Sequence, residues 1–227
     1  TQNKWGEYHQ EMAGKFDYNW KSYKTATDAI TTSLASEEVR GMSTFDFDET
    51  LIDKGENFII AEKNGQKIKI TSAAWPIQGP SLAAQGYSFD FNDFINVRGG
   101  VAGPLMTKFK NQIAKYGIDN VFILTARPME SAPAIKAWLE TQGIVMPIEN
   151  ITGLGNSTGE AKATWMLEKF AEGYNDMYFV DDAMPNVEAV KNVLDQLDIK
   201  SKVRQAIPLA SEDISNIFND ILETVTG

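Results

Sequence analysis

The sequence of 227 residues contains no cysteine and a single histidine, His9. The absence of cysteine excludes disulfides, thiolate metal sites and cysteine nucleophiles together. A Ser-His-Asp triad would depend on His9, which lies in the N-terminal stretch, far from any Ser or Asp that could partner it. Any catalytic or metal-binding site must therefore be built from polar side chains other than cysteine, and without a Ser-His-Asp triad.

Positive charge is also scarce, and long apolar runs are missing. Lys and Arg number 21 against 31 Asp and Glu, which gives a formal net charge of −10. This balance makes long nucleic acid an unfavourable partner. No apolar run reaches the roughly eighteen residues that a membrane span needs, and the N-terminus lacks a signal-peptide profile. We therefore expect no membrane association and a cytoplasmic location. Because the first residue is Thr1 rather than Met, the sequence suits a piece of a longer polypeptide with neighbouring domains.

The composition is that of a folded protein. Hydrophobic residues make up 43% and charged residues 23% of the chain. A chain of this length can bury one substantial core and carry a small additional module. The division that we expect is an N-terminal helical arm over 1–40, a core domain formed by 41–53 and 101–227, and an inserted module over 54–100.

Residues 1–40 are rich in aromatic side chains. Spacings of three and four from Trp5 to Tyr23 place them on one helical face. This face could bind an aromatic ligand, but packing of the helix on the main domain or on a neighbouring domain is the more common use of such a face.

From Pro104 onwards, apolar strands alternate regularly with helices. Strands that are continuous apolar runs, separated by helices of about ten to fifteen residues, are typical of a parallel sheet covered on both faces. The sequence thus predicts an α/β fold, a three-layer sandwich with a mostly parallel, Rossmann-like sheet. The expected helices lie near 104–116, 129–142, 158–172, 185–197 and 211–225, and the expected strands near 121–124, 148–152, 177–180 and 202–206. Gly117 should end the first of these helices, and Thr158 should cap the start of the third.

The inserted module has a different character. Two strand-like runs, 58–62 and 67–71, flank Asn64-Gly65, which is a strong hairpin signal. The stretch that follows Trp75-Pro76 is rich in Gly, Pro and Asn. We expect a hairpin and one short helix here. Arg98-Gly99-Gly100 could form a hinge or a loop that contacts substrate, but a simple turn is the preferred interpretation.

Reactive side chains follow three of the apolar strands. Asp46-Phe47-Asp48 ends the strand that begins near Met42, Thr125 ends the next, and Asp181-Asp182 ends the third. Lys162 lies in the first turns of a predicted helix. Ligands of such sheets bind at the carboxyl ends of the strands. Each feature alone is common in ordinary turns and helices, so the argument depends on their occurring together and in order.

Four carboxylates at one edge of a sheet need a cation. Each close pair costs several kcal/mol at a low effective dielectric, roughly as Coulomb's law predicts. A set of oxygen ligands without sulfur or imidazole favours Mg²⁺. A hydroxyl and an ammonium group at the same edge suit an anion with several oxygens, and phosphate fits this description.

The ordered set resembles the haloacid dehalogenase-like (HAD) superfamily of phosphohydrolases. Residues 46–50 resemble its Asp-x-Asp-x-Thr motif, and 121–125 its second motif, an apolar strand that ends in Thr or Ser. Lys162 resembles the third motif, and Asp181-Asp182 the double-Asp form of the fourth. The resemblance covers about residues 42–206. Glu49 stands where many members have Gly, and the Asp-x-Asp-Glu-Thr-Leu run is similar to phosphatases that act on the RNA polymerase tail.

This resemblance implies a role for each residue. Asp46 would attack phosphorus, and Asp48 would protonate the leaving oxygen and then activate water. Thr125 and Lys162 would hold phosphoryl oxygens, and Arg127 is a candidate second substrate contact, with a structural salt bridge as the alternative. Dehalogenases of the family typically lack the second Asp, so Asp48 favours phosphoryl transfer. The expected Mg²⁺ site comprises Asp46, Asp48, Asp181 and Asp182.

The resemblance also assigns the insert as a small cap over a fairly open site, and it leaves other functions open. A phosphomonoester is the expected substrate, although the same motifs serve many. A nucleotide or polynucleotide 3′-phosphatase is one alternative. Segments 180–183 and 200–203 also resemble domains of large tailed-bacteriophage proteins. The other alternative is therefore a structural or assembly module with vestigial activity, located in the host cytoplasm or the virion.

Overall fold

The computed structural model describes residues 38–207 of the chain. The predicted N-terminal arm lies outside this range except for residues 38–40, and the helix predicted near 211–225 lies outside it entirely. None of the helices within 38–207 combines the length and the hydropathy that a bilayer-spanning segment needs.

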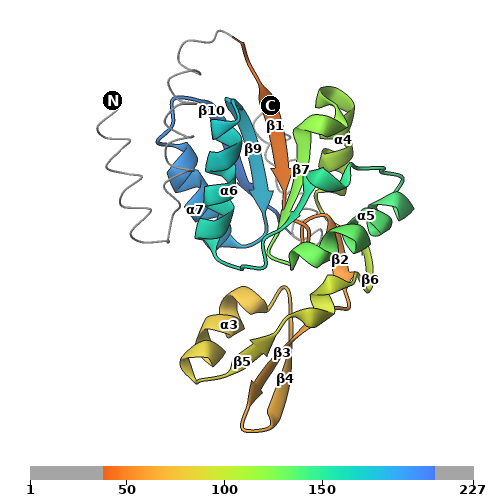
Figure 1. The fold of residues 1–227 in the computed structure, drawn as a ribbon, viewed down its shortest axis with the longest axis vertical. Helices are drawn as coiled ribbons and strands as arrows, with labels where there is room; N and C mark the ends of the chain where they lie inside the picture. Colours follow the sequence, from red (N-terminus) through yellow and green to blue (C-terminus); the bar gives the residue numbers. More distant parts are fainter. Residues whose placement is uncertain (1–37, 208–227) are drawn as a thin grey trace, which may run out of the picture.

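The centre of the described chain is a five-stranded parallel sheet (Figure 1). In spatial order its strands are β10 (Lys200–Gln205), β9 (Asp176–Asp181), β1 (Gly41–Phe45), β7 (Val121–Thr125) and β8 (Ile151–Gly153). Every pairing between neighbours is parallel. The order reverses at β1, with β7 and β8 on one side and β9 and β10 on the other. In sheets of this kind, the crevice at such a switch point binds the ligand.

Helices cover both faces of this sheet. The helices α4 (Met106–Tyr116) and α5 (Ala132–Thr141) pack on one face, and α6 (Gly159–Ala171) and α7 (Met184–Leu194) on the other (Figure 1). The β7 strand shows why both faces are apolar. Val121 and Ile123 join the α4–α5 side, while Phe122 and Leu124 join the α6–α7 side. The predicted three-layer α/β fold is confirmed.

Local sequence signals explain where most helices begin and end. Gly117, with a φ of 83°, ends α4, as predicted. Pro185 lies in the first turn of α7, where a missing N–H costs nothing. Three boundaries differ from the predicted ones. The α4 helix begins two residues after Pro104, α7 ends at Leu194 rather than near 197, and residues predicted as one helix near 129–142 form the short 3₁₀ helix η3 (Met129–Ser131) followed by α5.

One predicted strand is shorter than expected. Residues 148–150 form the 3₁₀ helix η4 (Ile148–Asn150), and the strand begins only at Ile151. Pro147 fixes the backbone before this turn. The Asn150 side-chain amide donates hydrogen bonds to the carbonyl oxygens of Ile118, in the 3₁₀ helix η2 (Ile118–Asn120), and of Val121. These bonds satisfy Asn150 in the turn, which an apolar pattern alone does not reveal.

The insert is joined to the core by a two-stranded ribbon. The strands β2 (Ile52–Gly55) and β6 (Gly99–Ala102) pair antiparallel. The turn predicted at Arg98-Gly99-Gly100 is therefore wrong. Gly99 and Gly100 have positive φ values, as a turn would require, but the register pairs Gly99 with Gly55 inside the ribbon.

Beyond the ribbon the insert forms its own small sheet. The strands β3 (Phe58–Lys63), β4 (Gln66–Thr71) and β5 (Ser88–Asp90) pair in the order β4-β3-β5. Asn64 and Gly65 both have positive φ and connect β3 to β4, which confirms the predicted hairpin. The helix α3 (Trp75–Ala84) and the 3₁₀ helix η1 (Asn92–Ile95) complete the insert. The third strand, β5, was not predicted.

Candidate active site

Asp46 and Asp181 lie side by side at the switch point of the sheet. Asp46 directly follows β1, and Asp181 is the last residue of the neighbouring strand β9. The Asp46 backbone N–H donates to the carbonyl oxygen of Val180, which extends the pairing of the two strands by one residue. Both side chains are buried, with exposed fractions of 5% and 0%. Buried carboxylates require partners.

Lys162 supplies that partner to both carboxylates. Its Nζ lies 2.7 Å from Asp46 Oδ1 and 2.6 Å from Asp181 Oδ2. Only 1% of the lysine is exposed. Burial opposes the charge, but the carboxylates of Asp181 and Asp46 outweigh this effect and hold the pKa of Lys162 above its usual value. Lys162 is thus a fixed cation between two strand ends, not an exposed helical lysine.

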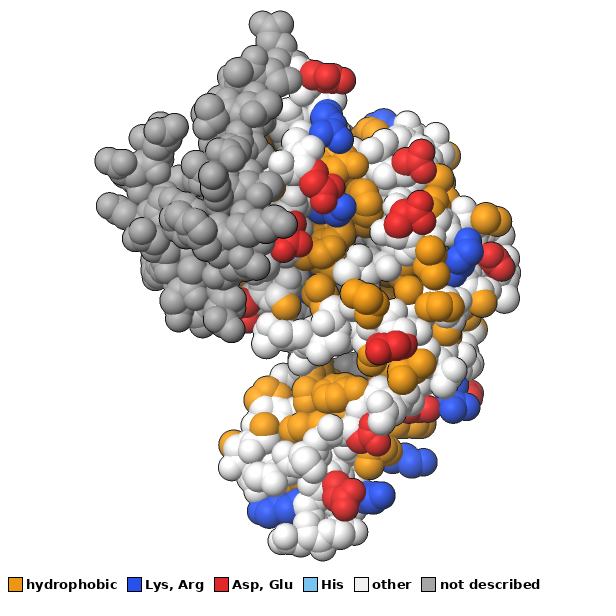
Figure 2. Space-filling model, viewed as in Figure 1, with side chains coloured by type: hydrophobic (Ala, Val, Ile, Leu, Met, Phe, Trp, Pro, Cys, Tyr) orange, Lys and Arg blue, Asp and Glu red, His pale blue; other side chains and the backbone are white. Residues whose placement is uncertain are grey.

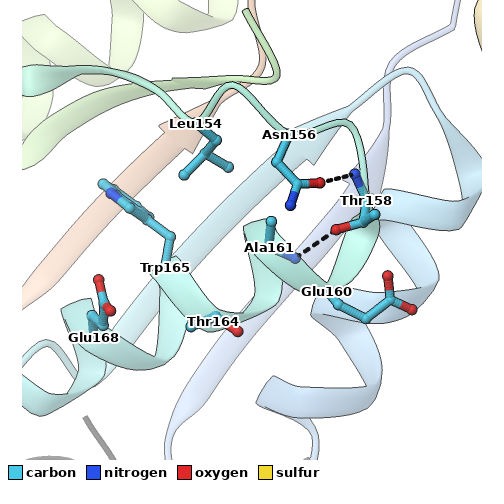
Figure 3. Close-up of a pocket in the computed structure, with 8 residues that line it drawn as sticks. All are labelled: Leu154, Asn156, Thr158, Glu160, Ala161, Thr164, Trp165 and Glu168. Atoms are coloured by element: carbon cyan, nitrogen blue, oxygen red, sulfur yellow. Dashed lines mark hydrogen bonds between the residues drawn. The ribbon is translucent and has the colours of Figure 1, made fainter. Parts of the chain in front are cut away.

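The capped start of α6 places Lys162 there. The Thr158 hydroxyl accepts a hydrogen bond from the Ala161 backbone N–H at 3.3 Å, and Asn156 Oδ1 accepts one from the Thr158 N–H at 2.9 Å (Figure 3). Gly159 lets this end of α6 approach α7 closely, because a Cβ at this position would come within 2.6 Å of the Pro185 carbonyl oxygen. The cap was predicted from the sequence, whereas the close approach was not.

A group of three carboxylates can hold a metal ion. Asp46, Asp181 and Asp182 each offer an oxygen, and these atoms all lie within 4.8 Å of one another. Burial raises the pKa of Asp46 to about 7, with Asp181 adding to the shift and Lys162 opposing it. Burial also raises the pKa of Asp182 to about 9, with contributions from Asp46 and Asp181. Three carboxylates face one ammonium, so a divalent cation would supply the missing positive charge. A set of oxygen donors suits a hard cation.

Asp48, the fourth predicted metal residue, has a different partner. The Arg127 Nε and one terminal nitrogen each donate to an oxygen of Asp48, at 2.8 Å in both cases. Asp46 and Asp48 would point the same way only if β1 continued through both of them, but β1 ends at Phe45. The chain turns at Glu49, which has a φ of 56°. Asp48 is outside the three-carboxylate group.

Arg127 also binds the insert. Its guanidinium donates to the carbonyl oxygens of Phe94 and Asn96, at 3.2 and 2.6 Å, and to Asn57 Oδ1 at 3.1 Å. The side chain is almost fully buried and lies over the rings of Phe47 and Phe94. Of the two alternatives for Arg127, the structure contains the salt bridge, which links the insert to the Asp48 carboxylate.

Thr125 ends β7 on the other side of β1. It is buried, and its hydroxyl oxygen accepts a hydrogen bond from the Arg127 backbone N–H at 3.1 Å. A hydroxyl whose oxygen already accepts in this way keeps its proton for donation to an anion. Thr125 lines the same cleft as Asp46 and Lys162.

This cleft lies between the core and the insert and has a volume of about 720 Å³. All of the predicted site residues line it: Asp46, Asp48, Thr125, Arg127, Lys162, Asp181 and Asp182. A second hollow of about 410 Å³ lies along the exposed side of α6, beside Trp165 (Figure 3). It contains none of the predicted site residues, so the first cleft is the candidate active site.

Sequence reasoning missed two residues of the site. The Asn186 amide donates to both oxygens of Asp181, at 3.1 and 3.0 Å, and fixes the orientation of that carboxylate. The Thr50 hydroxyl donates to Asp46 Oδ2 at 3.4 Å. Thr50 belongs to the first motif, so a signal for it was present. Asn186 lies one residue after Pro185 in the first turn of α7, a position that gives no such signal.

Comparisons of the chain with protein-family models, curated proteins and solved structures found no match.

Proposed function

We propose that this chain is a magnesium-dependent phosphomonoester hydrolase, similar to the HAD superfamily, in which Asp46 accepts the phosphoryl group. The observation that supports this best is the position of Asp46. Its carboxylate is buried at the end of a large cleft, 2.7 Å from the ammonium of Lys162 and within one cluster with Asp181 and Asp182. Such an arrangement brings a nucleophile and positive charge to the same point.

In the first step, an Asp46 oxygen would attack phosphorus as the bond from phosphorus to the leaving oxygen breaks. Asp48 would give its proton to that oxygen, which departs as an alcohol. A carboxylate nucleophile needs no separate base, because it attacks in its ionised form. Lys162 and the Thr125 hydroxyl would offset the charge on the transferred group.

In the second step, water would attack the phosphorus of the phosphoaspartate. Asp48 would take the water proton, and the bond between phosphorus and Asp46 would break, releasing inorganic phosphate. The enzyme returns to its starting state, since Asp48 regains the proton that it gave up. Arg127 would hold the ionised Asp48 of the second step through both hydrogen bonds. As the acid of the first step, Asp48 would carry its proton on one oxygen and keep the hydrogen bond from Arg127 at the other.

The residues present fit a magnesium ion. Asp46, Asp181 and Asp182 would hold it, and Asn186 would orient Asp181. When bound, the ion would neutralise phosphoryl charge and so lower the barrier to nucleophilic attack. The identity of the metal is part of the proposal.

The test compares Asp46→Asn with a matched surface variant, Asp195→Asn. Asp195 forms an exposed ion pair with Lys191 and lies outside the cleft. We expect Asp46→Asn to lose hydrolysis of p-nitrophenyl phosphate by many powers of ten and Asp195→Asn to keep it. Acid-quenched wild-type enzyme should also carry labelled phosphate from the substrate. Wild-type turnover by Asp46→Asn would remove Asp46 as the nucleophile.

A further inference from the structure

The insert contributes an uncharged, largely aromatic wall to the candidate active site. Ile59, Trp75, Phe89, Phe91 and Phe94 all line the cleft opposite the carboxylates. No charged residue of the insert lines it, because all of the charged lining residues belong to the core. In Figure 2, hydrophobic side chains gather on the side of the insert that faces the core, while its Lys and Arg side chains lie elsewhere on it.

Packing contacts within the insert fix the arrangement of the aromatic wall. The Trp75 ring packs edge-on against Phe89 and Phe91, with centroid distances of 4.9 and 5.0 Å. Gly79 gives the Trp75 ring its space, since a Cβ there would come within 2.7 Å of that ring. These contacts hold the aromatic rings in place before any ligand arrives, which lowers the entropic cost of binding.

The wall adjoins the catalytic groups. The centroid of the Phe94 ring lies 4.8 Å from the guanidinium carbon of Arg127. Arg127 Nε in turn donates to Asp48 Oδ2 at 2.8 Å. Under the proposed mechanism Asp48 protonates the leaving oxygen, so the leaving group must point toward the insert. The volume of about 720 Å³ suits a small molecule.

The charged residues that line the cleft disfavour a leaving group with a negative charge of its own. The lining carboxylates number six, and the two lining cations, Lys162 and Arg127, are both engaged by carboxylates. A second phosphate or carboxylate on the substrate would therefore meet apolar rings or like charge. An uncharged flat ring would instead find aromatic surfaces to pack against.

We propose that the insert selects phosphate monoesters whose leaving group carries a flat aromatic ring system and no further charge. This inference rests on the proposed phosphatase function. Two sources share this chemistry, aryl phosphates and nucleoside monophosphates, in which the ring is the base.

The test measures binding separately from turnover. With Mg²⁺ present, calorimetry compares three phosphonates that the enzyme cannot hydrolyse: benzylphosphonate, methylphosphonate and 3-phosphonopropionate. We expect benzylphosphonate to bind at least tenfold more tightly than either of the others. Equal affinities, or tighter binding of the carboxylate-bearing compound, would overturn the proposal, whether or not the protein hydrolyses anything.

A pair of variants assigns the preference to the wall. Ala83 and Ala84 are neighbouring exposed residues of α3, but only Ala83 lines the cleft. Ala83→Lys should lower the affinity ratio of benzylphosphonate to 3-phosphonopropionate at least tenfold, and Ala84→Lys should leave it unchanged. The same shift in both variants would mean that the wall does not contact the leaving group.

Turnover then distinguishes the two sources. We expect kcat/KM for phenyl phosphate, for nucleoside monophosphates or for both to exceed that for ribose 5-phosphate at least tenfold. Equal rates would refute the proposed selectivity. If benzylphosphonate binds preferentially but no monoester is hydrolysed, the proposed phosphatase function is wrong and the proposed aromatic binding site is supported.

Discussion

Arg127 donates one hydrogen bond to each carboxylate oxygen of Asp48, and both bonds are 2.8 Å long. The paired geometry is one that a guanidinium can make and an ammonium cannot. The same guanidinium also donates to Asn57, Phe94 and Asn96, so one side chain contacts both the insert and the proposed acid–base group.

The first prediction concerns the stability that this pair provides. Arg127→Met should lower the free energy of unfolding by roughly 3 kcal/mol, because breaking a buried pair leaves polar groups unpaired. Arg98→Met is the matched control. Arg98 pairs with Asp93 at the same 2.8 Å, but the arginine is exposed, so its loss should cost under about 1 kcal/mol. Equal losses in urea unfolding would contradict the structural role of Arg127.

The second prediction concerns Lys162. Lys162→Ala should reduce kcat about a hundredfold or more, as expected for the loss of one electrostatic stabiliser. Lys169, on the same helix, pairs instead with Glu172 and lies outside the cleft. Steady-state kinetics of Lys169→Ala should match the wild type. A similar loss in both variants would indicate that damage to α6, not the missing ammonium, is responsible.

The third prediction concerns pH and metal. Burial raises the pKa of Asp46 to about 7 and that of Asp182 to about 9, above the unfolded-state value of 3.8. The folded state therefore holds these protons more tightly, and the stability that they confer is present at low pH and lost as pH rises. In EDTA, the free energy of unfolding should fall between pH 5 and 8.5.

Magnesium should reverse that trend, because the ion binds the ionised carboxylates and not their protonated forms. The melting temperature at pH 8 should therefore rise when Mg²⁺ replaces EDTA, and Asp182→Asn should weaken the rise. A stability that is flat with pH in EDTA and indifferent to Mg²⁺ would argue against a cation at this cluster. Hydrolysis should likewise require Mg²⁺ and stop in EDTA.

The fourth prediction concerns Glu49, which has a φ of 56° and accepts a hydrogen bond from the Ser72 hydroxyl at 2.8 Å. Glu49→Ala and Glu49→Gly both lose this hydrogen bond, so the difference between their free energies of unfolding reports the backbone conformation alone. Glycine should be the more stable by about 1 kcal/mol, because a side chain is disfavoured in the left-handed region. The control is the same pair of substitutions at Glu188, inside α7. There the alanine variant should be the more stable one, by about the same amount. Alanine proving better at both positions would show that the turn does not need this conformation.

The sequence predicted the central sheet well because its signals are local. Runs such as 121–125 are apolar throughout, and Thr158 and Gly117 mark helix ends through short-range hydrogen bonds and φ preferences. Parallel strands place their carboxyl ends at one edge. For this reason the residues predicted for the site, Asp46 and Lys162 among them, line one cleft although they are 116 residues apart.

What the sequence could not predict depends on contacts between distant segments. Asp48 and Arg127 are 79 residues apart, and their pairing requires the turn at Glu49 and the docking of the insert. The aromatic wall is a similar case. Trp75, Phe89 and Phe91 share no simple period, because they come from a helix, a strand and a loop that meet only in the folded insert.

The ribbon that joins the insert to the core has an evolutionary consequence. Gly55 and Gly99 face each other across β2 and β6, so the chain leaves the core and returns to it at almost the same place. Whatever lies between these two glycines can be lengthened, shortened or exchanged without shifting the register of β1 or the start of α4. Relatives of this chain should therefore share the carboxylate cluster and the Asn57 contact to Arg127, while the segment between residues 58 and 92 can diverge more freely.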